Sequence, residues 1–217
     1  MNEGVLRQKD FWDKEVDAFD AIYSHKKNKF GILLDSIFRW DMYKRFDYTM
    51  ENAQPIENRA FLDVGCGTGQ YSLELARRNA RMITGIDISE KMIEVCRQRA
   101  AKKKLDNICS FIQTDLLKYQ PNVTFDVCIG IGLFDYIKEP LPVLAKMREC
   151  VRGKVVISFP RLWTWRAIVR KFRLLINQCD VYFYSRARID RLLKTAGFKR
   201  YSIQKIGQLY CISAFPE

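Results

Sequence analysis

Three glycines on alternate positions, Gly65, Gly67 and Gly69, follow a short apolar run and an acidic residue, Asp63. An apolar-periodic segment comes directly after them, which predicts a strand, a glycine loop and a helix. Glycine lets a ligand approach the main chain more closely than any Cβ would allow, and it lets the turn adopt positive φ. The loop is therefore expected to present backbone N–H groups to a bound ligand.

The identity of that ligand depends on the spacing and on Asp63. Dinucleotide-binding loops are spaced G-x-G-x-x-G, whereas residues 61–70 read F-L-D-V-G-C-G-T-G-Q, with the third glycine one position too early. This spacing disfavours a nicotinamide oxidoreductase. A carboxylate before the first glycine would repel a pyrophosphate but would suit a ligand with an ammonium group, and S-adenosylmethionine (SAM) is such a ligand.

The D-x-G-x-G-x-G pattern resembles the first motif of the class I SAM-dependent methyltransferases, and the resemblance extends from about residue 58 to the C-terminus. It implies SAM as the cofactor and methyl transfer as the activity. It also implies an α/β, Rossmann-like fold with a seven-stranded, mostly parallel sheet, helices on both faces and a C-terminal antiparallel hairpin. The residues of the loop that the resemblance assigns to the cofactor are Asp63, Gly65, Cys66, Gly67 and Gly69.

Further cofactor candidates follow later strands. Strands and helices alternate after the loop, which favours a parallel sheet whose strand ends meet at one edge. Asp87 ends the second strand, where a carboxylate can accept hydrogen bonds from ribose hydroxyls. Asp115 follows the third strand and resembles the family's aspartate for the adenine amine, although a turn-forming role is an alternative. The remaining candidates are Ile88, Leu116, Ile131, Tyr23 and Met92, the last of which also fits an ordinary core position.

The acceptor is expected beside the loop after the fourth strand, Phe125 to Gly130. Many small-molecule methyltransferases carry a histidine in this loop, but here Asp135 and Tyr136 are the nearest polar residues. They are the first two catalytic candidates, with a helix cap as the alternative for Asp135. His25, the single histidine, is the third, with a solvated surface position as its alternative. A histidine-built zinc site is thereby excluded and no metal is expected.

The chain is expected to consist of a helical cap, residues 1–56, and a methyltransferase domain, residues 57–217. A basic amphipathic insertion at about 161–181 places apolar residues on one helical face and Arg166, Arg170 and Arg173 on the other. It could lie on an anionic membrane, form the lid of an apolar acceptor pocket, or simply cover the core. Nucleic acid is disfavoured because no stacking platform interleaved with basic residues is evident, and N-P-P-Y or D-P-P-Y is absent.

Composition limits the remaining choices. The chain has 217 residues and a net charge of +12, an excess that fits nucleic acid, an anionic membrane surface or an acidic small substrate. Its seven cysteines include no C-x-x-C pair and are expected to be reduced. We expect a cytoplasmic protein, in peripheral contact with a membrane if the insertion binds one. The expected function is methylation of a small amphipathic or lipid-like acceptor, with RNA or protein as the alternative, and the oligomeric state stays open.

Overall fold

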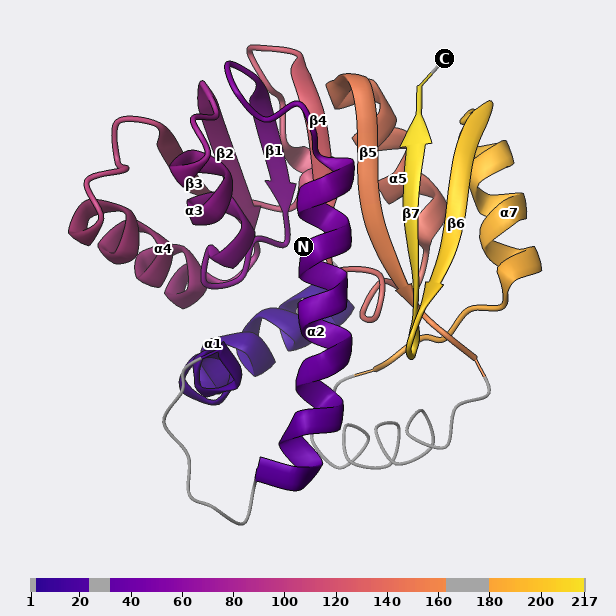
Figure 1. The fold of residues 1–217 in the computed structure, drawn as a ribbon, viewed down its shortest axis with the longest axis horizontal. Helices are drawn as coiled ribbons and strands as arrows, with labels where there is room; N and C mark the ends of the chain where they lie inside the picture. The colour runs from indigo at the N-terminus through magenta and orange to yellow at the C-terminus, as the bar shows by residue number, and fades with distance from the viewer. Residues whose placement is uncertain (1–2, 24–31, 163–179, 217) are drawn as a thin grey trace.

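One seven-stranded sheet organises the molecule (Figure 1). The computed structural model describes residues 3–23, 32–162 and 180–216, with side chains for 4–16, 41–162 and 180–216. The strands are β1 (Ala60–Val64), β2 (Met82–Asp87), β3 (Cys109–Gln113), β4 (Phe125–Gly130), β5 (Val151–Pro160), β6 (Arg200–Ile206) and β7 (Leu209–Phe215). They lie in the order β3-β2-β1-β4-β5-β7-β6.

The sheet is parallel except at β7. That strand runs antiparallel to both of its neighbours, β5 and β6, while the other pairs are parallel. Two residues separate β6 from β7, so these strands form the hairpin that the sequence predicts. The prediction of a Rossmann-like, mostly parallel seven-stranded sheet is confirmed.

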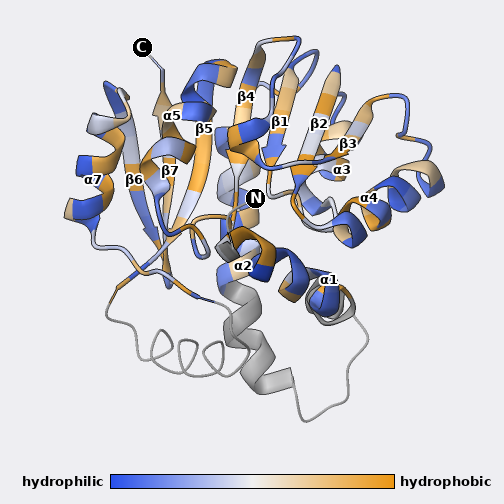
Figure 2. Cartoon of the chain, turned by 180° about the vertical axis from the view of Figure 1, so that it is seen from behind, coloured by the Kyte–Doolittle hydropathy of each residue, from blue (hydrophilic) through white to orange (hydrophobic). Residues whose placement is uncertain are grey.

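Helices cover both faces of the sheet. The helices are α1 (Glu3–Tyr23), α2 (Ile32–Asn52), α3 (Gln70–Arg77), α4 (Glu90–Lys102), the short η2 (Leu116–Lys118), α5 (Pro140–Cys150) and α7 (Arg186–Thr195). Buried residues of α2, α3 and α4 share one core cluster, and those of η2, α5 and α7 share the other. Figure 2 shows the central strands as largely hydrophobic. This is expected when a parallel sheet is covered on both sides.

The strand register brings the ends of β1, β2 and β4 to one edge. Asp63 of β1 lies opposite Gly85 of β2 and Ile129 of β4. Figure 1 shows α1 across this carboxyl edge, while α2 runs up along the sheet. Tyr48 and Met50 near the end of α2 belong to the core, so this part of the predicted cap packs as part of the fold. The boundary at residues 56 and 57 stays a prediction.

Two predicted features lie outside the described residues. These are His25 and positions 163–179, which hold most of the basic insertion. The side chain of Tyr23, at the end of α1, is also not described. Among the helices that are described, none combines the length and the apolar character needed to cross a bilayer.

Candidate active site

The glycine loop after β1 has the backbone conformation that its composition predicts. Gly65, Gly67 and Gly69 all have positive φ, at +68°, +54° and +79°. The Gly65 N–H donates to the Ile86 carbonyl of β2 (2.8 Å), which ties the loop to the neighbouring strand, and the Gly69 N–H donates to the Cys66 carbonyl (2.9 Å) within the loop. Side chains in this left-handed region would be strained, so the glycines are required by the backbone itself.

Asp87, at the end of β2, holds the glycine loop directly. Its Oδ2 accepts a hydrogen bond from the Gly67 N–H (3.0 Å), and its Oδ1 accepts one from the Ser89 N–H (2.9 Å). Burial raises the pKa of this carboxyl, and the two backbone donors oppose that rise. Each carboxylate oxygen has a second lone pair, so Asp87 can hold the loop and still accept hydrogen bonds from a ligand.

Asp63 lies in the interior beneath the loop. It is 2% exposed, and its Oδ2 accepts a hydrogen bond of 2.6 Å from the buried Ser72 hydroxyl of α3. Burial raises the pKa of Asp63 to about 7, and the nearby charge of Asp87 also raises it, whereas the Ser72 bond lowers it. Sequence reasoning missed Ser72, although a hydroxyl among the apolar positions of α3 was a usable signal.

The third strand end carries the adenine candidates. The Thr114 N–H donates to the Asp87 carbonyl (2.9 Å), which brings the end of β3 beside β2. Asp115 Oδ1 accepts from the Leu117 N–H (3.0 Å) and caps η2, so the turn-forming role is present. Leu116 and Met92 are both buried, and burial of Met92 is what its core alternative predicts. Contacts of these residues, and of Ile88, with a cofactor stay predictions.

The loop after β4 carries the catalytic candidates Asp135 and Tyr136. Gly132 has a φ of +78°, and its N–H donates to the buried Ser158 hydroxyl (2.9 Å). Ile131 is half-buried against the core. Asp135 is 3% exposed, and its carbonyl accepts from the Tyr182 N–H (2.8 Å). The capping alternative for Asp135 is wrong, because Glu139 is the N-cap residue of α5.

Two tyrosines, Tyr182 and Tyr184, lie just before α7. Tyr184 is fully buried, and its hydroxyl donates to the Ile137 carbonyl (3.0 Å). Its ring packs edge-on against Phe159, with ring centres 4.8 Å apart. Burial raises the pKa of Tyr184 to about 12. Tyr184 is therefore a core residue that fixes the loop after β4.

Three residues of α1 form what we call the α1 clasp: Gln8, Trp12 and Asp13. Gln8 donates to the Tyr136 carbonyl (2.5 Å), and the Trp12 ring meets the Tyr136 ring edge-on, with centres 5.0 Å apart. Asp13 accepts from the Ser89 hydroxyl (2.5 Å). The clasp thus joins the loop after β4 to the loop after β2, on either side of the glycine loop. Nothing in the sequence indicated these partners.

Trp12→Ala is expected to raise the dissociation constant for SAM about three- to tenfold. The aromatic pair with Tyr136 contributes about 0.5–1.5 kcal/mol beyond the area that it buries, and its loss loosens α1 over the edge where the ligand candidates lie. Calorimetric titration measures the affinity, and hydrogen exchange of residues 4–16 reports the loosening. Lys14→Ala, an exposed position of the same helix, is the control. Unchanged exchange in the Trp12 variant would contradict the clasp.

The comparisons with known proteins agree with this geometry. A family model described as a methyltransferase domain matches residues 56–196. The chain belongs to this methyltransferase family. The sequence-based assignment to the class I SAM-dependent methyltransferases is thereby confirmed.

Structural neighbours of this methyltransferase extend over its whole length. One is magnesium protoporphyrin IX methyltransferase from Synechocystis PCC 6803 with bound SAH, with a TM-score of 0.79, 19% identity and coverage of 98% of this chain and 100% of that one. Another is a DhpI–SAH complex, with a TM-score of 0.69, 17% identity and coverage of 100% and 98%. At these identities the likeness supports the fold.

Sequence relatives of the methyltransferase are named as enzymes of another kind. The tRNA U34 carboxymethyltransferase of Haemophilus influenzae strain PittEE is 31% identical over 127 residues, which are 57% of this chain and 38% of that protein. The corresponding protein of Mannheimia succiniciproducens is 30% identical over 132 residues, 59% and 40% of the two chains. The alignment thus spans about two fifths of the length of these relatives.

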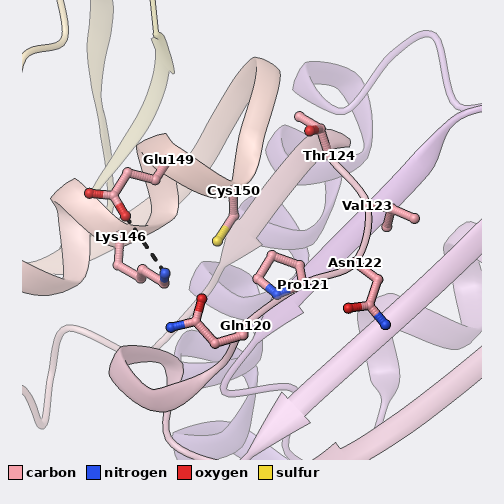
Figure 3. A pocket seen from close by; sticks show the side chains of 8 residues that line it. All are labelled: Gln120, Pro121, Asn122, Val123, Thr124, Lys146, Glu149 and Cys150. Atoms are coloured by element: carbon pink, nitrogen blue, oxygen red, sulfur yellow. Dashed lines mark ion pairs between the residues drawn. The ribbon is translucent and has the colours of Figure 1, made fainter.

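A groove at the opposite edge of the sheet is separate from this site (Figure 3). It measures about 370 Å³ and is lined by residues 120–124 together with Lys146, Glu149 and Cys150. The segment leads into the amino end of β4, whereas the glycine loop lies at the carboxyl edge. Lys146 and Glu149 form an ion pair of 3.6 Å at its side. The groove contains none of the candidate residues.

Proposed function

We propose that the chain holds SAM in the glycine loop and methylates a small amphipathic acceptor bound beside the loop after β4. The observation that carries the proposal is the Asp87 carboxylate bonded to Gly67 at 3.0 Å, with the buried Asp63 below the same loop. Gly65, Gly67 and Gly69 leave the backbone open to a close ligand. SAM, when bound, supplies an activated methyl group on a sulfonium.

Each strand end contributes one part of the proposed binding. Asp63 provides negative charge for the ammonium of the ligand, and Asp87 accepts from the ribose hydroxyls. Asp115 and Leu116 receive the adenine, which extends over the ends of β2 and β3. Because the leaving group is already activated, the protein mainly supplies proximity and orientation, which can contribute about 7–11 kcal/mol.

Proton removal from the acceptor is assigned to Asp135 or Tyr136. A positioned general base contributes about 10²–10⁴-fold. Trp12 and Tyr136 give this side of the site an aromatic rim, which suits an acceptor with an apolar body. The full-length likeness to a porphyrin methyltransferase supports an acceptor of this kind.

RNA is the second candidate acceptor. The sequence relatives are named as tRNA-modifying enzymes, and the exposed side of α7 is strongly basic. Because the aligned region spans only about two fifths of those relatives, the small acceptor remains our first proposal.

The test is to incubate the protein with methyl-labelled SAM and, in separate reactions, a lipid and metabolite extract or total RNA. We expect labelled product in the extract reaction, together with stoichiometric S-adenosylhomocysteine. Asp87→Ala is the control for background transfer. Label in the RNA reaction alone would replace the first candidate by the second, and no S-adenosylhomocysteine in either reaction would contradict both.

A further inference from the structure

The exposed side of α7 and the following strand start carries a dense row of cations. We call this row the α7 stripe; it consists of Arg186, Arg188, Arg191, Lys194, Lys199 and Arg200, all of them exposed. The only acidic residue within α7 is Asp190, which is bonded to Lys194 (2.8 Å) and to the Tyr201 hydroxyl (2.5 Å). The charge of the stripe is therefore mostly uncompensated by its own helix.

Three arginines of the stripe, Arg186, Arg188 and Arg191, work against the stability of the helix that carries them. Arg186 and Arg188 lie in the first turn of α7, which contains no acidic residue. Positive charge at a helix N-terminus opposes the macrodipole. Arg188 and Arg191 are also like charges three positions apart, an arrangement that destabilises a helix. Arg188 lies over the Tyr184 ring (4.8 Å) and Arg200 over the Phe215 ring (4.4 Å), so these two arginines also pack on the fold. Among the described residues Arg186 and Arg191 have no such ring contact, and a violation of local rules without a structural gain points to a function.

The stripe starts at the edge of the sheet that holds the candidate site. The Tyr184 N–H, two residues before α7, donates to the carbonyl of Pro160 at the end of β5 (2.9 Å). Since β5 runs parallel to β4 and β1, this end lies at the same edge as the glycine loop. Ten residues of α7 extend about 15 Å from there, and Lys199 and Arg200 continue the stripe at the start of β6.

We propose that the α7 stripe binds the phosphodiester backbone of RNA. A length of about 15 Å corresponds to about four phosphates along one strand of a nucleic acid helix. A membrane fits less well, because an interfacial helix inserts an apolar face. The apolar residues of α7, Ile189 and Leu193, are already buried in the core.

This inference goes beyond the proposed function, since the stripe can bind RNA whatever the acceptor is. It also bears on the choice of acceptor. RNA held along α7 would have one end at the rim of the site, beside the loop after β4, because Tyr184 contacts Ile137 of that loop. This is the geometry that the second candidate function requires.

The test compares two triple variants with equal loss of charge. Arg186→Gln/Arg191→Gln/Lys199→Gln removes three cations of the stripe. Lys102→Gln/Lys103→Gln/Lys104→Gln removes three exposed cations at the end of α4. These lie near β3, the edge strand on the other side of the sheet from β6. Binding of a labelled single-stranded RNA of mixed sequence is followed by fluorescence anisotropy over a series of salt concentrations.

We expect the stripe variant to lose at least tenfold in affinity at low salt. The slope of log K against log salt should fall by about 2, since each phosphate contact on a single strand contributes about 0.7. The control variant should keep the wild-type slope. Equal losses in both variants would overturn the proposal, and so would wild-type protein that binds phosphatidylserine vesicles but no RNA.

Calorimetry with SAM separates this proposal from the proposed function. The stripe variant should bind SAM like the wild type, which also shows that it is folded. Wild-type protein that binds RNA through the stripe but does not bind SAM would contradict the proposed function and leave the stripe proposal standing. Wild-type protein that binds SAM but no RNA would contradict the stripe proposal and leave the proposed function standing.

Discussion

Asp87→Ala is expected to raise the dissociation constant for SAM at least 100-fold. The substitution removes the acceptor for the ribose hydroxyls and also releases the Gly67 and Ser89 N–H groups from their 3.0 and 2.9 Å bonds. A hydrogen bond to a charged group contributes about 1.5–3 kcal/mol, so losing two or more amounts to at least about 3 kcal/mol. Isothermal titration calorimetry measures the change.

Two control variants separate the contributions of Asp87. Asp87→Asn keeps one side-chain oxygen that can accept from the loop, and it should bind SAM with intermediate affinity. Glu94→Ala removes one negative charge from an exposed position of α4 and should bind like the wild type. If Asp87→Ala bound SAM as tightly as the Glu94 variant, the assignment of the glycine loop as the cofactor site would be wrong.

The parts of the site that the sequence predicted are those that depend on short stretches of chain. The positive φ of Gly65, Gly67 and Gly69 follows from residue type alone. Asp87 comes at the end of a strand whose apolar run is visible in the sequence, and parallel strands bring their ends to one edge. The mostly parallel sheet and its closing hairpin follow from the alternation of elements together with the family resemblance.

The parts that the sequence did not predict depend on contacts between distant segments. Gln8 meets Tyr136, and Asp13 meets Ser89, across long separations in the chain. Side-chain periodicity indicates that α1 has a buried face but not which loops that face covers. Tyr184 illustrates the converse error. In the sequence an aromatic residue near a site can be interpreted as a ligand contact, and only its burial in the structure shows that it belongs to the core.

Asp63 connects the stability of the fold with its function. An ionised carboxylate is expensive to bury unless an opposite charge pairs with it. Among the described residues the side-chain partner of Asp63 is the neutral Ser72 hydroxyl, which lowers the pKa of Asp63 less than burial raises it. The ligand-free protein therefore holds a carboxyl that is half protonated near neutral pH. A cationic ligand would stabilise the ionised form, so binding of SAM should release a proton below about pH 7.

The same carboxyl makes wild-type stability depend on pH. Its pKa is about 7 in the folded protein and about 3.9 in an unfolded chain. The folded state therefore binds more protons between these values, and wild-type stability falls as pH rises from about 4 to 7. The full destabilisation is present above pH 7.

Asp63→Asn should stabilise the ligand-free protein above pH 7 and weaken SAM binding at least 100-fold. A pKa difference of about three units corresponds to about 4 kcal/mol, and we expect about 1–3 kcal/mol of gain because the amide brings hydrogen-bonding needs of its own. Urea unfolding from pH 4 to 8 should show that the difference in unfolding free energy between variant and wild type narrows as pH falls.

Wild-type affinity for SAM should drop about tenfold per pH unit below 7, since the carboxyl must ionise to bind the ammonium. Parallel stability curves for the two proteins would show that Asp63 does not titrate in this range, and affinity independent of pH would remove it from the binding site.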